Sequence, residues 1–543
     1  MQSLSRARAL PLPAARPRAA AWLAAARLDL ALALGVLALG LVVRLPALIN
    51  VPVLTDETEE VRYALGIALG AHLPLRNVEG YMGPWNNYLT ALALALFGYS
   101  MLVARGLSLV LGTLTVALVY PLGRALGLGR GGATLAAALL AVNGAHVLMA
   151  SHIAWSNSTT AFYTTLAAVL ALQTARRPAA APQPRWLVPA RLVAGLALQT
   201  HPLAILVLLP LAASLARAGR AQGWLWGRWT ALALLAALIA YSPLLIDNLR
   251  TGFGGVDDAL RLRSDYESGE PFGLDTYLRN ASALPVELAQ VLDGSFAPPD
   301  EALADPALAP AAALLVLALL WASRRGLWLP LACAALTALA LPLVNPRYSV
   351  VTDSRYLMSL LPFLLVAAAA LAEDALRWAR AHLAAPAATP RLAATAVALA
   401  TLAGAAAALA LPAQRLAAYE ADTPPYNSEL QRFADGVLAA RRPGEPLYMD
   451  DRLRLYRKGS RSRSRPLTLM LEFAGAPAEQ IAIPELGRSL ARQPAPSVLL
   501  ISAPEPDLGG AGMRAYDTLR IDWNRPEDEI KLRAYRIYTR RAA

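Results

Sequence analysis

RLPALINVPVLTDETEEVRYALGIALGAHLPLRNVEGYMGPWNNY, residues 44–88, joins the first long apolar run of the chain to the next. It contains Asp56, Glu57, Glu59 and Glu60, a density of carboxylates found nowhere else in the first two hundred residues. Carboxylates at a membrane face are costly to desolvate unless they are paired or used in function. We therefore predict that the chemistry takes place in the outer loop 50–101, and that the apolar segments are the scaffold around it.

The composition of the whole chain is that of an integral membrane protein. Of its 543 residues, 56% are apolar and 16% are charged, and the mean hydropathy is +0.42. A formal charge of +12 would favour a nucleic-acid partner in a soluble protein. Here the arginines concentrate in short loops between apolar runs, where they fix orientation, so we expect no nucleic-acid partner. The single cysteine, Cys333, lies in an apolar run and offers neither a disulfide nor a cysteine metal site.

The chain divides into three parts. Residues 1–27, rich in Ala, Pro and Arg, are predicted to be a basic cytoplasmic arm before an uncleaved signal anchor; a cleaved secretory peptide is the alternative. Residues 28–411 contain the apolar runs and form the predicted transmembrane domain. From residue 412 the sequence is mixed and polar with short β-like runs, so we expect 412–543 to be a soluble extracytoplasmic α/β domain.

Uninterrupted apolar length predicts a polytopic α-helical fold of about eleven spans. They lie near 28–49, 102–122, 131–149, 159–175, 187–200, 202–216, 229–247, 308–322, 327–344, 355–372 and 391–411. The apolar part of 84–100 is too short to cross a bilayer, and we predict a membrane-surface helix there. That choice puts the arginine-rich loops on the side of the N-terminal arm, as the positive-inside rule requires. The N-terminus is then cytoplasmic, and the Ala- and Arg-rich composition points to a bacterial plasma membrane.

Several motifs follow one another along this scaffold. They are Arg44-Leu45-Pro46, Thr55-Asp56-Glu57, Gly83-Pro84 with Tyr88, Leu96-Phe97-Gly98-Tyr99-Ser100 with Arg105, Ser151-His152 with Asn157, Tyr241-Ser242-Pro243 with Asn248, and Ser354-Arg355-Tyr356 with Pro362. In their order and spacing the sequence resembles the GT-C superfamily of membrane glycosyltransferases, in particular the protein O-mannosyltransferases and lipid A aminoarabinose transferases. The resemblance covers roughly residues 30–375 and leaves the C-terminal domain outside it.

The resemblance implies a polyprenyl-phosphate-linked sugar as donor, bound at the outer face, and transfer of the sugar to an acceptor hydroxyl. It maps the catalytic base of the family onto Asp56. The chemistry of the residues agrees, because a hydroxyl is a poor nucleophile until a carboxylate takes its proton, and a lipid phosphate leaves readily when cations stabilise it. Single displacement with inversion is the expected course. The sugar, hexose or pentose, and the acceptor, protein or glycolipid, stay open.

Asp56 and Glu57 are the predicted catalytic residues. Asp56 could instead cap the helix TEEVRYALGIAL, but that explains one acid and not four. For Glu57, substrate positioning and a salt bridge to a membrane-facing arginine are equal alternatives. Glu59 and Glu60 are expected to be solvated or to pair with nearby arginines.

The donor phosphate needs cations or N–H groups at the outer face. We predict Arg355 for this role, because a guanidinium offers paired donors that match phosphate oxygens; Arg347 competes with it, and a snorkelling arginine is the structural alternative. His201 lies where some relatives carry a phosphate-binding lysine between two short helices, and the break Gln199-Thr200-His201-Pro202 predicts such a pair here. A capping or packing histidine is equally compatible.

Four outer-loop residues, Tyr88, His152, Asn157 and Tyr356, are the predicted substrate contacts. For His152 a structural role within its loop is the favoured alternative. The aminoarabinose branch of the family places an aspartate in this region, and this sequence has none between 128 and 244, so a second carboxylate must come from elsewhere.

No cofactor or metal is assigned. The five histidines show no HxxxH spacing, so a divalent metal would rest on Asp56 and Glu57 alone and is left open. The sequence carries no Walker A or Rossmann fingerprint, which fits a lipid-linked donor better than a nucleotide. The main alternative function is a lipid or solute transporter or flippase, which predicts mid-span ionisable residues and internal repeats; neither is evident. A non-catalytic scaffold would leave the acidic loop without a purpose.

Overall fold

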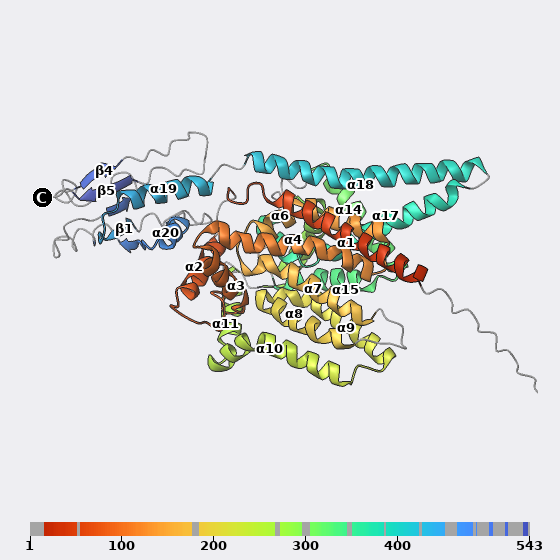
Figure 1. The fold of residues 1–543 in the computed structure, drawn as a ribbon, viewed down its shortest axis with the longest axis horizontal. Coiled ribbons are helices and arrows are strands. Elements are labelled where there is room, and N and C mark those ends of the chain that lie inside the picture. Colours follow the sequence, from red (N-terminus) through yellow and green to blue (C-terminus); the bar gives the residue numbers. More distant parts are fainter. Residues whose placement is uncertain are drawn as a thin grey trace, which may run out of the picture.

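The chain folds into a bundle of mostly apolar helices with a small sheet near its C-terminal end (Figure 1). The structure is a computed structural model, and it describes residues 16–50, 55–175, 184–266, 272–295, 304–344, 350–384, 387–422, 426–450, 464–481, 485, 499–502, 516–519 and 536–540.

The helices of the first half are α1 (Arg16–Arg44), α2 (Thr55–Ala68), α3 (Trp85–Phe97), α4 (Met101–Ala125), α5 (Arg130–Val142), α6 (Gly144–Ser151), α7 (Ser156–Ala175), α8 (Leu187–Thr200), α9 (Ile205–Gln222), α10 (Arg228–Arg250) and α11 (Gly254–Tyr266). Short 3₁₀ turns, η1 (Pro184–Trp186) and η2 (Pro202–Ala204), precede α8 and α9. The second half contains α12 (Leu274–Asp293), α14 (Leu308–Arg325), α15 (Trp328–Val344), α16 (Val350–Leu357), α17 (Leu361–Leu383), α18 (Ala388–Asp422), α19 (Tyr426–Ala440) and α20 (Ser464–Phe473).

Several of these helices are long and apolar enough to cross a bilayer. Within the described residues they are α1, α4, η2 with α9, α10, α14 and α18, and α5 with α6 adds a span bent by 67°. Each segment expected to span overlaps a helix, but two of them are interrupted. The segment 131–149 is divided between α5 and α6, and 355–372 is divided where α16 ends at Leu357 and α17 begins at Leu361. The protein is thus a membrane protein built from several apolar helices, while the count of about eleven spans stays a prediction.

Local sequence explains where two of the helices begin and end. The Ser100 hydroxyl accepts a hydrogen bond from the backbone N–H of Val103 and caps α4. His201 has an extended backbone (φ −165°, ψ 137°) because the proline that follows it disfavours the helical region. The break predicted between two short helices at His201 is therefore confirmed.

Small residues bring the central helices close together. A Cβ atom at Gly195 of α8 would lie 2.7 Å from the backbone oxygen of Ala237 on α10. The first ten residues of α17, Leu361 to Ala370, are all buried at the centre of the bundle. A tightly packed centre fixes the helix ends, and the loops that carry polar residues are thereby held in place.

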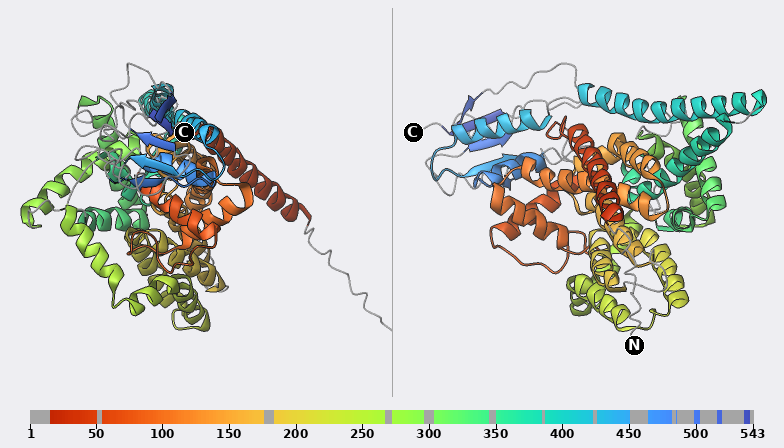
Figure 2. Two further views of the ribbon diagram at one scale, coloured as in Figure 1. Left: turned by 90° about the vertical axis from the view of Figure 1, so that its left-hand side faces the viewer. Right: turned by 45° about the vertical axis from the view of Figure 1, so that its right-hand side comes forward.

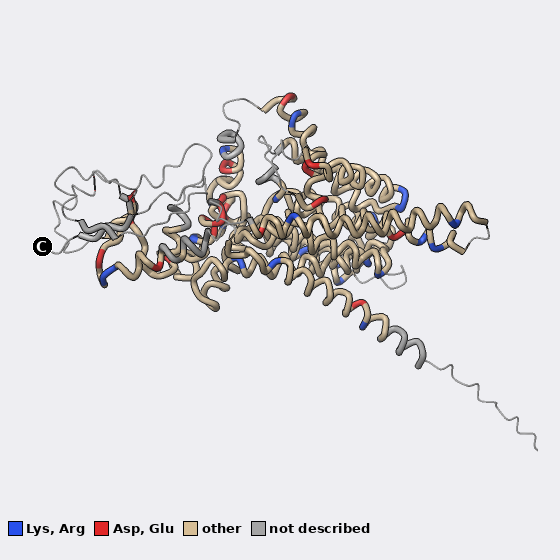
Figure 3. Tube along the Cα trace, turned by 90° about the horizontal axis from the view of Figure 1, so that it is seen from above, with Lys and Arg blue, Asp and Glu red and all other residues tan. Residues whose placement is uncertain are grey.

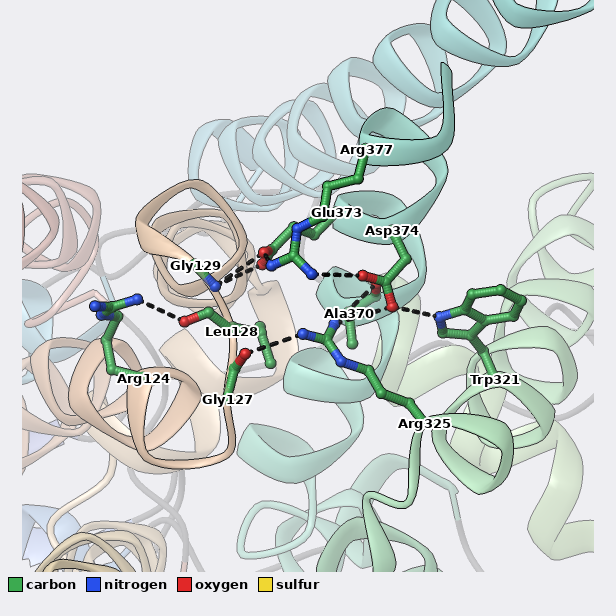
Figure 4. A network of polar contacts seen from close by, with 10 residues as sticks. All are labelled: Arg124, Gly127, Leu128, Gly129, Trp321, Arg325, Ala370, Glu373, Asp374 and Arg377. Atoms are coloured by element: carbon green, nitrogen blue, oxygen red, sulfur yellow. Dashed lines mark hydrogen bonds and ion pairs between the residues drawn. The ribbon is translucent and has the colours of Figure 1, made fainter. Parts of the chain in front are cut away.

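One end of the bundle is held by a network of polar contacts between the α4–α5 turn, α14 and α17 (Figure 4). Both carboxylate oxygens of Glu373 accept from the backbone N–H of Gly129, 2.9 Å away, at the start of α5. Arg325 donates to the backbone oxygen of Gly127 and pairs with Asp374 at 3.2 Å. Figure 3 shows arginines in blue in the connections at this end.

The sheet lies at the same end of the molecule as α2 (Figures 1 and 2). Its strands are β1 (Leu447–Asp450), β2 (Glu479–Ile481), β3 (Leu499–Ser502), β4 (Tyr516–Leu519) and β5 (Arg536–Arg540), in the order β2-β1-β3-β5-β4. β1 pairs parallel with β2 and β3, and β5 pairs antiparallel with β3 and β4. The last helix of the bundle, α18, continues past residue 412 to Asp422, so the α/β part begins later than the expected boundary.

The α/β part rests on α2. Buried side chains of α2, Val61 and Leu65, belong to one apolar cluster with Leu467 and Leu471 of α20. Beside it, Arg62 Nε lies 2.7 Å from Glu472 Oε2. The helix that carries the acidic cluster is therefore packed on one side by the C-terminal part of the chain.

Candidate active site

Asp56 and Arg355, two residues predicted from separate motifs, meet in an ion pair. Arg355 Nη1 lies 3.3 Å from Asp56 Oδ2, which joins the start of α2 to the end of α16. The Asp56 side chain is 42% exposed and that of Arg355 is 16% exposed. The carboxylate therefore stays within reach of a molecule arriving from outside, while the guanidinium is mostly enclosed.

Aromatic rings hold the Arg355 guanidinium in place. Its Cζ lies 5.0 Å from the ring centroid of Trp155 and 4.8 Å from that of Tyr356, and Nη2 donates to the Tyr356 hydroxyl at 2.8 Å. Trp155 is only 2% exposed. Contacts of this kind stabilise a cation while they fix its direction. Arg355 is thus a positioned group, unlike a snorkelling arginine whose head lies in water.

His201 lies beside the same group with its ring buried. Its centroid is 5.3 Å from that of Tyr356 and 6.1 Å from that of Tyr81. Burial, followed by the nearby Arg355 charge, lowers the pKa of His201 to about 3. Nδ1 accepts from the Leu203 backbone N–H at 3.1 Å, so the neutral ring carries its proton on Nε2. His201 can therefore offer a neutral N–H donor, where a lysine would offer a charge.

Glu57 is buried within a salt bridge. Its two oxygens lie 2.7 Å from Arg105 Nε and 2.8 Å from Arg105 Nη2, and both side chains are essentially unexposed. Oε1 also accepts from the Ala154 backbone N–H at 2.8 Å, and Arg105 Nη1 donates to the Leu48 oxygen. Glu57 thus forms a salt bridge, as the alternative expected, but its partner Arg105 is buried in the protein and does not face the membrane. This placement corrects the expectation that Glu57 faces the substrate, because a fully enclosed carboxylate cannot take a proton from an incoming hydroxyl.

Glu60 is also buried, and the expectation that it is solvated or pairs with an arginine is wrong. Its Oε2 accepts from the Ser156 backbone N–H at 2.8 Å and from the Ser156 hydroxyl at 2.5 Å. Asn77 Nδ2 donates to the same hydroxyl at 2.9 Å. Burial raises the pKa of Glu60 to about 7, against the lowering effect of these hydrogen bonds.

Glu79 is a further carboxylate near the pair, and sequence reasoning overlooked it. Its pKa is raised first by burial and then by the negative charges of Asp56 and Glu59, whereas the Arg355 charge lowers it. Glu79 is therefore close enough to Asp56 and Arg355 for their charges to act on it. Its position within the acidic stretch, directly before Gly80-Tyr81, was the available signal.

The loop that carries Glu79 is fastened to the end of α8. The Gly83 backbone N–H donates to the Gln199 backbone oxygen at 2.8 Å, and the Trp85 N–H donates to Gln199 Oε1 at 3.2 Å. A Cβ atom at residue 83 would lie 2.5 Å from that Oε1. Glycine is therefore required at this close approach of loop and helix.

The other predicted substrate contacts have structural partners or lie elsewhere. His152 is fully buried with Nε2 2.8 Å from the Arg44 backbone oxygen, which corrects its expected contact with substrate in favour of the structural alternative. The Tyr88 hydroxyl donates to the Pro74 oxygen at 2.9 Å. Asn157 is half-buried in the first turn of α7. Arg347 lies outside the described residues.

Within the described ranges, the His, Cys, Asp and Glu side chains form no group of three or more that could hold a metal ion. The chemistry that these residues can perform on their own is proton transfer at a half-exposed carboxylate beside an enclosed guanidinium. Such a pair suits a reaction in which a hydroxyl loses a proton while a phosphate leaves.

Comparisons with known proteins address the fold. Residues 82–246 match the family model described as dolichyl-phosphate-mannose-protein mannosyltransferase. ArnT from Cupriavidus metallidurans, solved bound to undecaprenyl phosphate, shares 15% identity at a TM-score of 0.55, over 95% of this chain and 97% of that one. The apo state of that protein gives the same score and identity over 96% and 98%.

A more distant likeness is to the archaeal oligosaccharyltransferase AglB from Archaeoglobus fulgidus, in complex with an inhibitory peptide and a dolichol-phosphate. It has 15% identity and a TM-score of 0.45, over 86% of this chain and 69% of that one. No curated protein sequence matches the chain. From the fold shared with ArnT along nearly its whole length, and from the matched segment 82–246, the chain has the GT-C fold and resembles the membrane glycosyltransferases of that superfamily.

Proposed function

We propose that this protein is a glycosyltransferase that moves a sugar from a polyprenyl-phosphate donor to an acceptor hydroxyl at the outer membrane face. The observation that carries the proposal is the ion pair between Asp56 and Arg355. It places a carboxylate able to take a proton beside a guanidinium able to hold a phosphate. The undecaprenyl phosphate bound by ArnT, which has the same fold, supports a lipid phosphate as the carrier.

In the proposed reaction Arg355 exchanges partners. The donor phosphate takes the place of Asp56 at the guanidinium, because the phosphodiester offers the same pair of anionic oxygens as the carboxylate. Asp56 is thereby released to act as a base. Since its side chain is 42% exposed, the acceptor can approach it without any rearrangement of the buried residues.

The bond changes balance in a single displacement. The acceptor oxygen gives its proton to Asp56 and attacks the anomeric carbon, while the bond from that carbon to the phosphate oxygen breaks on the opposite face. The electron pair leaves with the polyprenyl phosphate, whose added charge Arg355 stabilises. The configuration at the sugar is inverted. In this scheme the Nε2–H of His201 donates to a phosphate oxygen, and Tyr356 orients the guanidinium through their hydrogen bond.

The test is transfer of radiolabelled sugar from a panel of polyprenyl-phosphate sugars to membrane acceptors by the purified protein. Removing a general base lowers the rate by about 10²–10⁴-fold, so Asp56→Asn should lose nearly all transfer while its melting temperature is kept. Arg355→Ala should weaken donor binding as well as turnover. Asp257→Asn, at an exposed aspartate of α11, is the matched control and should transfer normally.

The same samples separate this proposal from its alternative. Lipid flipping without sugar transfer would support a transporter. Transfer that continues undiminished in Asp56→Asn would refute the proposed mechanism. The donor that labels the acceptors identifies the sugar, and the labelled product identifies the acceptor as protein or glycolipid.

A further inference from the structure

Two carboxylates on one face of α2 accept hydrogen bonds from the segment 154–156. Glu57 accepts from the backbone N–H of Ala154, and Glu60 accepts from the backbone N–H and the hydroxyl of Ser156. Residues three apart on a helix share a face, so both carboxylates reach the same short segment. Trp155 lies between the two bonded residues, and its backbone position is fixed from both sides.

The Trp155 side chain contacts the candidate site. Its ring lies 5.0 Å from the Arg355 guanidinium, which is paired with Asp56. Asp56 and Glu60 are four residues apart on α2 and therefore lie one turn apart on the same face. The contacts form a closed path that runs from Asp56 through Arg355, Trp155 and Ser156 to Glu60, and begins and ends on one helix.

Helix capping alone accounts for part of this arrangement. A carboxylate at the first residue of α7 is favourable for any helix, because the N-terminal N–H groups lack partners. Glu373 does the same at the start of α5, far from the site, where it accepts from Gly129 (Figure 4). Glu60 differs from Glu373 in one respect. The residue before the capped Ser156 is Trp155, and its ring lies against the Arg355 guanidinium.

We propose that Glu60 is a positioning residue, which holds Trp155 against Arg355 through Ser156 and so fixes the guanidinium where it exchanges Asp56 for the donor phosphate. The inference rests on the proposed function for the identity of that ligand. The positioning itself is a property of the protein without ligand. It predicts that a substitution at Glu60 impairs ligand binding by Arg355, although no described hydrogen bond joins the two residues.

The first experiment measures the dissociation constant of undecaprenyl phosphate for the full chain in detergent. Glu60→Ala removes the acceptor for Ser156 and should weaken binding about tenfold, the upper end of what one uncharged hydrogen bond contributes. Glu60→Gln keeps an oxygen acceptor of the same shape and should restore binding. Glu373→Ala removes a similar capping carboxylate at the opposite end, so it should lower the melting temperature but leave the dissociation constant unchanged.

Double variants show whether Glu60 acts through Arg355. Binding by Glu60→Ala/Arg355→Ala should equal binding by Arg355→Ala alone, because the positioned group is already absent. Trp155→Leu keeps the backbone contacts of the segment and should weaken binding as Glu60→Ala does, which provides a second variant if Glu60→Ala does not fold. If Arg355→Ala weakens binding while Glu60→Ala and Trp155→Leu do not, the inference is overturned and the proposed function stands.

Melting temperatures measured without ligand test the role of Glu60 independently of the proposed function. If the wild type binds no polyprenyl phosphate, the proposed function fails. The melting temperatures of the same variants then show whether Glu60 positions Arg355. A combined loss in Glu60→Ala/Arg355→Ala smaller than the sum of the two single losses supports the path between them. Additive losses overturn it.

Discussion

Removing Glu57 should unfold part of the outer region of the protein rather than stop the chemistry directly. In Glu57→Ala the Arg105 guanidinium, 1% exposed, loses both carboxylate oxygens at 2.7 and 2.8 Å. Breaking a buried pair from one side costs about 3–5 kcal/mol, because the remaining charge stays enclosed. The Ala154 N–H loses its acceptor as well, at about 1–3 kcal/mol.

These contributions do not simply add, because Arg105 keeps its hydrogen bond to the Leu48 oxygen and the segment can relax. We expect a loss of about 4 kcal/mol in the free energy of unfolding, which is a large part of the stability of most proteins. Glu57→Leu combined with Arg105→Met removes both charges at similar volume, and it should recover most of that loss.

The assay is denaturant-induced unfolding of the detergent-solubilised protein, followed by sugar transfer below the melting temperature of each variant. The structural reading predicts that transfer follows folding, so that the Glu57→Leu/Arg105→Met protein regains activity with its stability. A double variant that is as stable as the wild type but as inactive as Asp56→Asn would refute this reading and return Glu57 to the chemistry. Unchanged stability in Glu57→Ala would refute it as well.

Three further predictions concern the same region. Because burial raises the pKa of Glu60 from 4.5 to about 7, the folded protein holds a proton that the unfolded chain releases, so stability should fall as the pH rises from about 5 to about 7; melting temperatures of Glu60→Gln should show a flatter profile. Gly83→Ala puts a Cβ atom 2.5 Å from Gln199 Oε1 and should cost about 1–3 kcal/mol in unfolding experiments, with a loss of transfer. The Arg62–Glu472 pair is 36% and 21% exposed, so Arg62→Ala should cost at most about 1 kcal/mol, an effect that vanishes in high-salt melting curves.

Local signals were enough to predict the helices and to select Asp56 and Arg355, two residues that the structure brings into contact. Apolar runs placed the helices because a bilayer requires length and hydrophobicity, which can be read without any partner. Pro202 marked the break at His201, since a proline acts on the residue before it. The concentration of acids identified Asp56, and the motif at Arg355 identified its partner, although their contact spans 299 positions in the sequence.

The errors came from contacts that are distant in sequence. Glu57 and Glu60 look like the polar face of a surface helix, and only the approach of Arg105 and Ser156 makes them buried. The break between α16 and α17 had a signal in Pro362, which the structure places in the first turn of α17, where proline is tolerated. It was overlooked because the apolar run continues across it.

The packing of α20 on α2 bears on how the protein is made. The Arg62–Glu472 contact joins residues 410 positions apart, so α2 emerges from the ribosome long before the helix that covers its apolar side. During that interval Val61 and Leu65 have no native partner from the C-terminal part. Contacts of such high sequence separation form late in folding, and exposed apolar surface invites misassembly until they do. The acidic helix therefore reaches its final environment among the last steps of biosynthesis, after the bundle that carries it has already been inserted in the membrane.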